Sequence, residues 1–242
     1  MAFIMGVGWV LPGSMGYGRN RQWIDPVPGP LPALRPKDIF RVPCPRFGRM
    51  DAFTQYSMAA IAFALRDAGL EEWDQKRPIG IIASSVNGCL DTDFRYYETV
   101  IPKNGILASP QLFAYTLASS FLGEAAIHFG LDGPCYVLSE QPGDHQMCLK
   151  TALLSLSAGE CDTLLSGVSD LDISAGLLDA GHRSSGFLYF VLENAQHRSV
   201  PNYGMLTMNL AGDILFRDRV IVDFWMLADA CLYPFPSIRG AS

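Results

Sequence analysis

The 242-residue sequence has few charged side chains. Charged residues make up 17% of the chain, and 18 basic against 24 acidic residues give a formal net charge of −6. A hydrophobic share of 49% excludes a disordered chain. We see no cluster of Lys or Arg to neutralise phosphates, so we expect no nucleic-acid partner. The low charge predicts instead that a partner covers part of the surface.

Long apolar runs are also missing. A membrane-spanning helix needs about 18 or more consecutive apolar residues, and the sequence has no such run. The apolar start MAFIMGVGWVLPG has no basic residue before Arg19, unlike a secretory signal. We therefore expect a buried first strand, no membrane association and a cytoplasmic protein.

The six cysteines and four histidines form no metal-binding pattern. Neither CxxC pairs nor HxxxH or HExxH motifs occur. We expect reduced thiols, no metal and no cofactor. Cys135 and Cys148 are expected to be inert thiols of the core, and His128 a core histidine.

A dinucleotide-binding loop is not supported either. Gly6, Gly8 and Gly13 follow one another closely, but GVGWVLPG lacks the third glycine of GxGxxG, and no acidic residue ends a second strand in the expected place. We expect a tight turn here.

Hydrophobic periodicity predicts alternating strands and helices. The helices are expected at 51–69, with Asp51 as N-cap, at 109–130 as one buried helix, and at 144–158. The strands are expected at 2–10, 78–85, 135–139, 163–168, 186–193 and 204–210, the last two forming a hairpin. This order predicts an α/β layered domain with a mixed sheet. The long loop 12–49 is expected to pack on a partner or cover a site.

The turn LSEQPGDHQMC, residues 138–148, has no cysteine or serine at its tip. Strand-to-helix turns often present a nucleophile, yet this one offers Glu140, Gln141 and Pro142. A triad of Ser139, Asp144 and His145 is disfavoured, because triads are assembled from distant segments and neighbouring helical residues point about 100° apart.

Six segments in this order resemble the N-terminal half of β-ketoacyl-ACP synthases. They are MGVGWVLP, RMDAFTQYSMAAIAFALRDAGL, IGIIASSVNG, SPQLFAYTLASSFLGEAAIHFGLDGPCYVLSE, GECDTLLSGVSD and SSGFLYFVLE. The resemblance, which covers residues 4 to 212, implies the thiolase fold, here its N-terminal half only. We expect one truncated domain over 1–242, with an apolar tail at 213–242 that lies outside the resemblance.

The resemblance also implies what is missing. Active relatives carry TAC in the turn, and its cysteine falls on Pro142 here, or on Gln141 with a shift of one. The turn EQPGD is similar to the EQAGG of chain-length factors, the inactive partners of ketosynthases in type II polyketide systems. No HGTGT-like or GFGG-like segment is present, so the histidines and oxyanion loop of the family are absent.

These comparisons predict a non-catalytic, chain-length-factor-like subunit and not an enzyme. Its expected partners are an active ketosynthase and, through the complex, an acyl carrier protein in polyketide or fatty-acid biosynthesis, with an aryl polyene as product. Two alternatives stay open: a malonyl-carrier decarboxylase that starts chains, and a homodimeric acyl-binding scaffold.

The resemblance assigns two surfaces. The strand of Cys135, Tyr136, Val137, Leu138 and Ser139 is expected to pair across a dimer interface. Cys89, Thr92 and Tyr96, spaced i, i+3 and i+7, are expected to line an acyl tunnel, with ordinary helix packing as the alternative. The helix at 144–158 is expected to expose apolar surface that the tail 221–236 and a ketosynthase cover.

Overall fold

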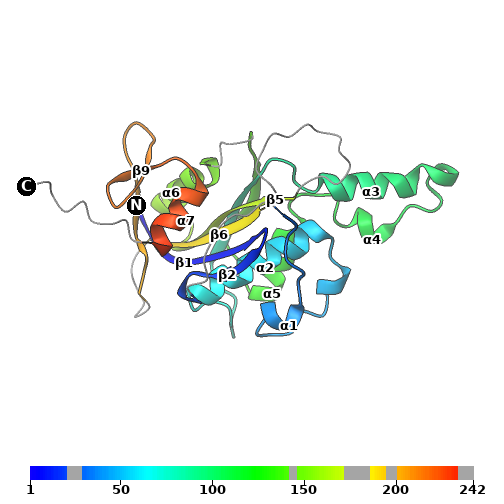
Figure 1. Ribbon diagram of the computed structural model, residues 1–242, viewed down its shortest axis with the longest axis horizontal. Coiled ribbons are helices and arrows are strands. Elements are labelled where there is room, and N and C mark those ends of the chain that lie inside the picture. Colours follow the sequence, from blue (N-terminus) through cyan, green and yellow to red (C-terminus); the bar gives the residue numbers. More distant parts are fainter. Residues whose placement is uncertain (21–28, 142–145, 172–185, 195–200, 234–242) are drawn as a thin grey trace, which may run out of the picture.

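The structure, a computed structural model, describes residues 1–20, 29–141, 146–171, 186–194 and 201–233 (Figure 1). The strands are β1 Ala2–Leu11, β2 Ser14–Tyr17, β3 Ile79–Ser85, β4 Cys135–Ser139, β5 Thr163–Asp170, β6 Gly186–Glu193, β7 Gly204–Met208, β8 Ile214–Phe216 and β9 Arg219–Ile221. The α-helices are α1 Pro36–Ile39, α2 Ala52–Asp67, α3 Leu90–Val100, α4 Pro110–Phe113, α5 Ser120–Phe129, α6 Met147–Ala158 and α7 Phe224–Leu232. Short 3₁₀ helices are η1 Gly18–Asn20, η2 Phe47–Arg49 and η3 Pro102–Gly105.

All of these strands belong to one mixed sheet, in the order β4-β3-β5-β6-β1-β7-β8-β9, with β2 paired to β1. β3 is parallel to β4 and β5, and the other pairs are antiparallel. All seven residues of β3 are buried, as expected of a parallel strand covered on both faces. The expected α/β class with a mixed sheet is confirmed.

Helices cover both faces of this sheet (Figure 1). One hydrophobic core lies between the sheet and the α2 and α5 side. A second core lies between the sheet and α6 with α7. β1 serves both, because alternate side chains of a strand point to opposite faces: Val10 lies in the first core, and Val7 and Trp9 in the second.

The glycines of β1 let α2 lie unusually close to the sheet. A Cβ atom on Gly8 would lie 2.1 Å from the Ala64 nitrogen, and one on Gly6 would lie 2.5 Å from the Ala64 oxygen. The expected tight turn is therefore wrong for these two glycines, which are inside a strand. It is right for Gly13, whose φ of 75° lies in the turn between β1 and β2.

The N-terminus of α2 is built as predicted. Asp51 is its N-cap and accepts a hydrogen bond from the Thr54 nitrogen at 3.0 Å. The same carboxylate accepts a second hydrogen bond from the hydroxyl of Thr92 on α3, at 2.5 Å. Asp51 thus joins the buried helix to the base of the next one.

The single buried helix expected at 109–130 is wrong. The segment forms α4 and α5, and Phe113 of α4 is exposed. Hydroxyl groups explain the break between them, because the Thr116 side chain donates to the Phe113 oxygen and the Ser120 side chain to the Ala114 oxygen. Such bonds compete with the backbone pattern of a helix.

The hairpin expected at 186–210 is also wrong. β6 and β7 do not pair with each other, because β1 lies between them and is antiparallel to both. The two strand predictions themselves are confirmed. Alternation of apolar residues identifies a strand but does not identify its neighbour.

The segment 213–233 adds to the sheet and to the second core. β8 and β9 extend the edge beyond β7, and α7 packs on β6 through Phe224 and Phe190, whose ring centroids lie 5.5 Å apart. The side chain of Gln146, the N-cap of α6, donates to the Val222 oxygen at 2.8 Å. Even so, Met147 and Leu154 of α6 keep more than half of their surface exposed.

Candidate functional site

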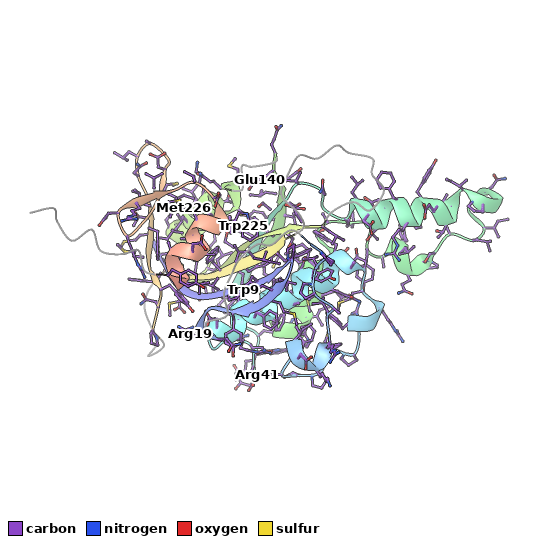
Figure 2. The ribbon with its side chains drawn as sticks, in the orientation of Figure 1. Trp9, Arg19, Arg41, Glu140, Trp225 and Met226 are labelled. Atoms are coloured by element: carbon purple, nitrogen blue, oxygen red, sulfur yellow. The ribbon has the colours of Figure 1, made fainter. Side chains whose placement is uncertain are left out.

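The turn between β4 and α6 is the expected place of the site. Glu140 is buried at its start, and its backbone nitrogen donates to the Ser85 oxygen of β3 at 3.1 Å. Its side chain is labelled in Figure 2. The carboxylate accepts a hydrogen bond from the Cys148 nitrogen in the first turn of α6, at 3.1 Å. A negative side chain is favourable at a helix N-terminus. Gln141 is exposed, and Pro142, Asp144 and His145 lie outside the described residues.

The thiol that follows this turn is not prepared for nucleophilic attack. Cys148 is fully buried, and its sulfur donates to the Ser84 hydroxyl at 3.3 Å. Burial raises the pKa of this thiol from its ordinary value of 9.0 to about 12. At neutral pH the thiol therefore stays protonated, whereas the thiolate is the reactive form. The expected place of Cys148 in the core is confirmed, and the inertness of its thiol stays a prediction.

The other five thiols show the same trend. Burial raises the pKa of Cys89 to about 12, helped by the neighbouring Asp93 carboxylate. Burial is also the main cause of a raised pKa at Cys44, Cys135, Cys161 and Cys231. No disulfide joins any of the six cysteines, all of which lie in the described part of the chain. None of the six therefore has the lowered pKa of an activated cysteine.

Of the four histidines, only His128 lies in the described ranges. It is half-buried on α5, with its ring against Phe40 and Phe129 at centroid distances of 5.0 and 4.6 Å. Burial lowers its pKa. This confirms a packing role in the core.

β4, the expected interface strand, lies at one edge of the sheet. Among the described strands it pairs only with β3. Cys135 and Ser139 are exposed, and Tyr136, Val137 and Leu138 are half-buried. Cys135 is thus not a core residue as expected, because it lies at an open edge. Pairing with another subunit stays a prediction, and the free edge is where such pairing takes place.

The three candidate tunnel residues lie on the inner side of α3. Thr92 is buried on Asp51, and Cys89 is buried with its sulfur 3.7 Å from the Asp93 carboxylate. The ring of Tyr96 lies 5.5 Å from that of Phe113 on α4. These contacts are those of helix packing, and a tunnel-lining role stays a prediction.

Residues 89–118 form an arm that extends away from the sheet (Figure 1). Its base is fixed by Asp170 at the end of β5, whose carboxylate accepts hydrogen bonds from Val86 and Asn87 nitrogens at 2.8 and 3.2 Å. Large exposed apolar side chains are concentrated on it. They are Phe94, Tyr97, Ile101, Ile106, Leu107, Phe113 and Leu117.

This exposed surface of the arm was not predicted from the sequence. Phe94, Tyr97 and Ile101 are spaced i, i+3 and i+7, so they share one face of the helical turn, opposite to the side that packs on α4. This spacing is visible in the sequence. It looks like a core-facing stripe, and only the tertiary arrangement shows that it is exposed.

The described residues contain no group of three or more His, Cys, Asp or Glu side chains placed to hold a metal ion. No described helix is both long and apolar enough to cross a membrane.

The sequence profile of the β-ketoacyl synthase N-terminal domain matches residues 33–188, which is more than half of the chain. The chain belongs to the β-ketoacyl synthase family. The 3-oxoacyl-[acyl-carrier-protein] synthase 2 of Vibrio cholerae is 28% identical over 120 residues, which are 49% of this chain and 29% of that protein. The chain therefore matches under a third of this longer relative.

Two solved structures show the fold. The ketosynthase ApeO in complex with its chain length factor ApeC from Xenorhabdus doucetiae aligns with a TM-score of 0.61 and 16% identity, over 81% of this chain and 80% of the matched one. A ketosynthase complex with a type II polyketide acyl-carrier protein, AntDE:AntF, aligns with a TM-score of 0.65 and 17% identity, over 85% and 67%. The thiolase-like fold expected of this ketosynthase-family chain is confirmed.

Proposed function

We propose that this chain is a non-catalytic ketosynthase-like subunit, with the role of a chain length factor, that pairs with an active β-ketoacyl synthase. The observation that carries the proposal is the turn between β4 and α6. It has no cysteine at residues 140–146, and the nearest thiol, Cys148, is buried with a pKa of about 12. A condensing subunit needs a reactive nucleophile to take the acyl chain.

Two exposed features support a partner of this kind. Among the described strands, β4 has one unpaired edge, and the arm begins beside its end, where the Glu140 nitrogen donates to the Ser85 oxygen. The arm itself exposes large apolar side chains, among them Phe94, Tyr97 and Phe113. An open strand edge and exposed aromatic residues are both suited to a protein interface, whose core is rich in aromatics.

The alignment with the ApeO–ApeC complex gives further support. It covers 81% of this chain and 80% of the matched chain. That complex joins a ketosynthase to a chain length factor. By analogy with the AntDE:AntF complex, we propose that the acyl substrate is bound to a carrier protein. The product that the resemblance implies is a polyene.

Acyl transfer and co-purification test the proposal. The chain alone should take up no labelled acyl group from its carrier protein, and co-expression with the ketosynthase from the same pathway should give a 1:1 complex by native mass spectrometry. Thioester formation on the isolated chain, or carbon dioxide release from malonyl-carrier protein, would contradict the non-catalytic role. A stable homodimer that ignores the ketosynthase would favour the scaffold alternative.

Thiol labelling tests where the partner binds. Cys135 is exposed on β4, whereas Cys148 is fully buried, so a maleimide should modify Cys135 first. In the complex we expect Cys135 to be protected. Labelling of Cys135 at an unchanged rate in an intact complex would place the interface elsewhere. The Cys135→Ser variant, which should lose the fast-labelling site, is the control.

A further inference from the structure

A cleft of about 580 Å³ lies between strand β2 and helix α2. Ten residues line it, and eight of them come from the segment 13–38. This segment is part of the long loop that the sequence predicts to pack on a partner or cover a site. Natural ligand sites have volumes of about 300 to 1,000 Å³, so the cleft is large enough to hold a ligand. The proposed function does not use it.

Strand β2, beside the cleft, is also an edge strand. Among the described strands it pairs only with β1. Leu11 and Ser14 flank a two-residue turn, so they form a hydrogen-bonded pair, and hydrogen-bonded and non-hydrogen-bonded pairs alternate from there. The backbone N–H and C=O groups of Met15 and Tyr17 therefore point away from β1. Such groups can hydrogen-bond to an extended peptide that adds a strand to the sheet.

The α2 side of the cleft is fixed and carries a compensated charge. The Arg66 guanidinium lies over the rings of Tyr17 and Phe63, 5.8 and 5.6 Å from their centroids. The same guanidinium donates hydrogen bonds to the Glu71 carboxylate at 2.6 and 2.8 Å. Arg66 is therefore already neutralised, and its contacts hold this wall of the cleft in place.

Asp38 carries the one uncompensated charge among the residues that line the cleft. It is exposed, and no cation of the described residues lies within 4.0 Å of its carboxylate. Arg35 and Lys37 are its neighbours in the sequence but do not line the cleft. The cleft is therefore complementary to a ligand with a positive charge, and the net charge of −6 favours the approach of such a ligand.

We propose that β2 and this cleft form a docking site for an extended basic peptide of another protein, which pairs with the free edge of β2 and places a Lys or Arg side chain beside Asp38. Alternate side chains of a strand point to the same face. The cation and the residues two positions away from it therefore enter the cleft, where the Met15 and Tyr17 side chains lie.

The inference does not depend on the proposed function. Strands β3, β5, β6 and β1 lie between β4 and β2 in the sheet. A protein bound at β2 therefore leaves the β4 edge free. In this way the subunit can hold two different proteins at the same time.

A displayed library of nine-residue peptides, selected on the full chain, tests the proposal. We expect enrichment of peptides that carry Lys or Arg among strand-forming residues. For a synthetic copy of the most enriched peptide, D38K should raise the Kd by about tenfold at low salt and by less at high salt, because exposed charges are screened. The matched control is D74K, which makes the same change of net charge at an exposed residue outside the cleft and should leave the Kd unchanged.

Methylation of the peptide's backbone nitrogens tests the strand pairing without changing the protein. In an added strand, every second N–H of the peptide points toward β2. Methylation of these nitrogens should weaken binding by about fivefold or more each, because a hydrogen bond contributes about 1 kcal/mol. Methylation of the nitrogens between them should have a much smaller effect.

Four results would overturn the docking site. They are a selection without enrichment, enriched peptides that lack a cation, equal binding by D38K and the original chain, and equal effects of methylation at every position. The maleimide reaction of Cys135 gives a further check of the location. The bound peptide should leave this reaction unchanged, and protection of Cys135 would assign the peptide to β4 and contradict docking at β2.

Discussion

Helices α2 and α3 are both rich in apolar and aromatic residues, yet the fold uses them in opposite ways. Twelve of the sixteen residues of α2 are buried, between the sheet and α5, whereas Thr92 is the one buried residue of α3. Apolar side chains on α2 stabilise the chain itself. Those on α3 contribute little to its stability and are available to another protein. The comparison predicts that substitutions in the two helices affect different measurements.

The largest effect on stability is expected when α2 is pushed away from the sheet. Gly8→Ala would place a methyl group 2.1 Å from the Ala64 nitrogen, so helix or strand must move. We expect a loss of about 3 kcal/mol in the free energy of unfolding, measured with urea. The matched control is Gly48→Ala, where no atom lies within 4 Å of the added methyl. Its stability should stay within about 0.5 kcal/mol of the original.

A smaller effect is expected where the two helices are joined. Asp51→Ala removes the N-cap of α2 and the acceptor of the Thr92 hydroxyl. The cap and the hydrogen bond contribute about 1 kcal/mol each, so unfolding should become easier by about 2 kcal/mol. Hydrogen exchange should also accelerate in α3. Asp51→Asn can still cap the helix, so it should lose less than half as much free energy of unfolding. An equal loss in the two variants would show that the missing cap is not the cause.

A third substitution tests the exposed face of α3. Tyr97→Ala removes an exposed aromatic ring, 61% accessible, so the stability of the isolated chain should change by under about 0.5 kcal/mol. Binding to the ketosynthase should weaken by about tenfold, measured by calorimetry, because aromatic residues dominate interface energies. A variant that loses stability but binds normally would assign Tyr97 to the fold instead.

The smallest effect concerns pH. The pKa of the buried Cys148 thiol rises from 9.0 to about 12 in the folded chain. A raised pKa means that its contribution to stability is complete below pH 9 and is lost as the pH rises toward 12. At pH 10 the loss is about 1 kcal/mol relative to pH 8. Cys148→Ala should show a correspondingly smaller loss between these two pH values, and an identical loss would contradict the burial effect.

Much of the fold could be predicted from the sequence. Hydrophobic periodicity and the N-cap Asp51 identified α2, and apolar runs identified β3, β4, β5 and β6. The errors concerned relations between distant residues. The break between α4 and α5 depends on which hydroxyls reach backbone oxygens, and the position of β1 between β6 and β7 depends on sheet order. A local sequence pattern indicates neither these hydroxyl contacts nor the order of strands in the sheet.

The candidate site shows the same limit. The missing cysteine at 140–146 is a sequence fact, and the high pKa of Cys148 follows from burial that the strand and helix pattern already indicated. The exposure of Phe94, Tyr97 and Ile101 could not be predicted, because an apolar stripe at helical spacing is normally buried.

The place of β1 in the sheet also bears on how the protein is made. β1 is synthesised well before its sheet neighbours β6 and β7, which begin at Gly186 and Gly204. Its buried apolar residues must therefore wait for these two strands before that part of the sheet can form. Contacts between such distant residues slow folding and leave unpaired strands open to aggregation. We expect nascent chains of this protein to depend on chaperones until β6 and β7 have emerged.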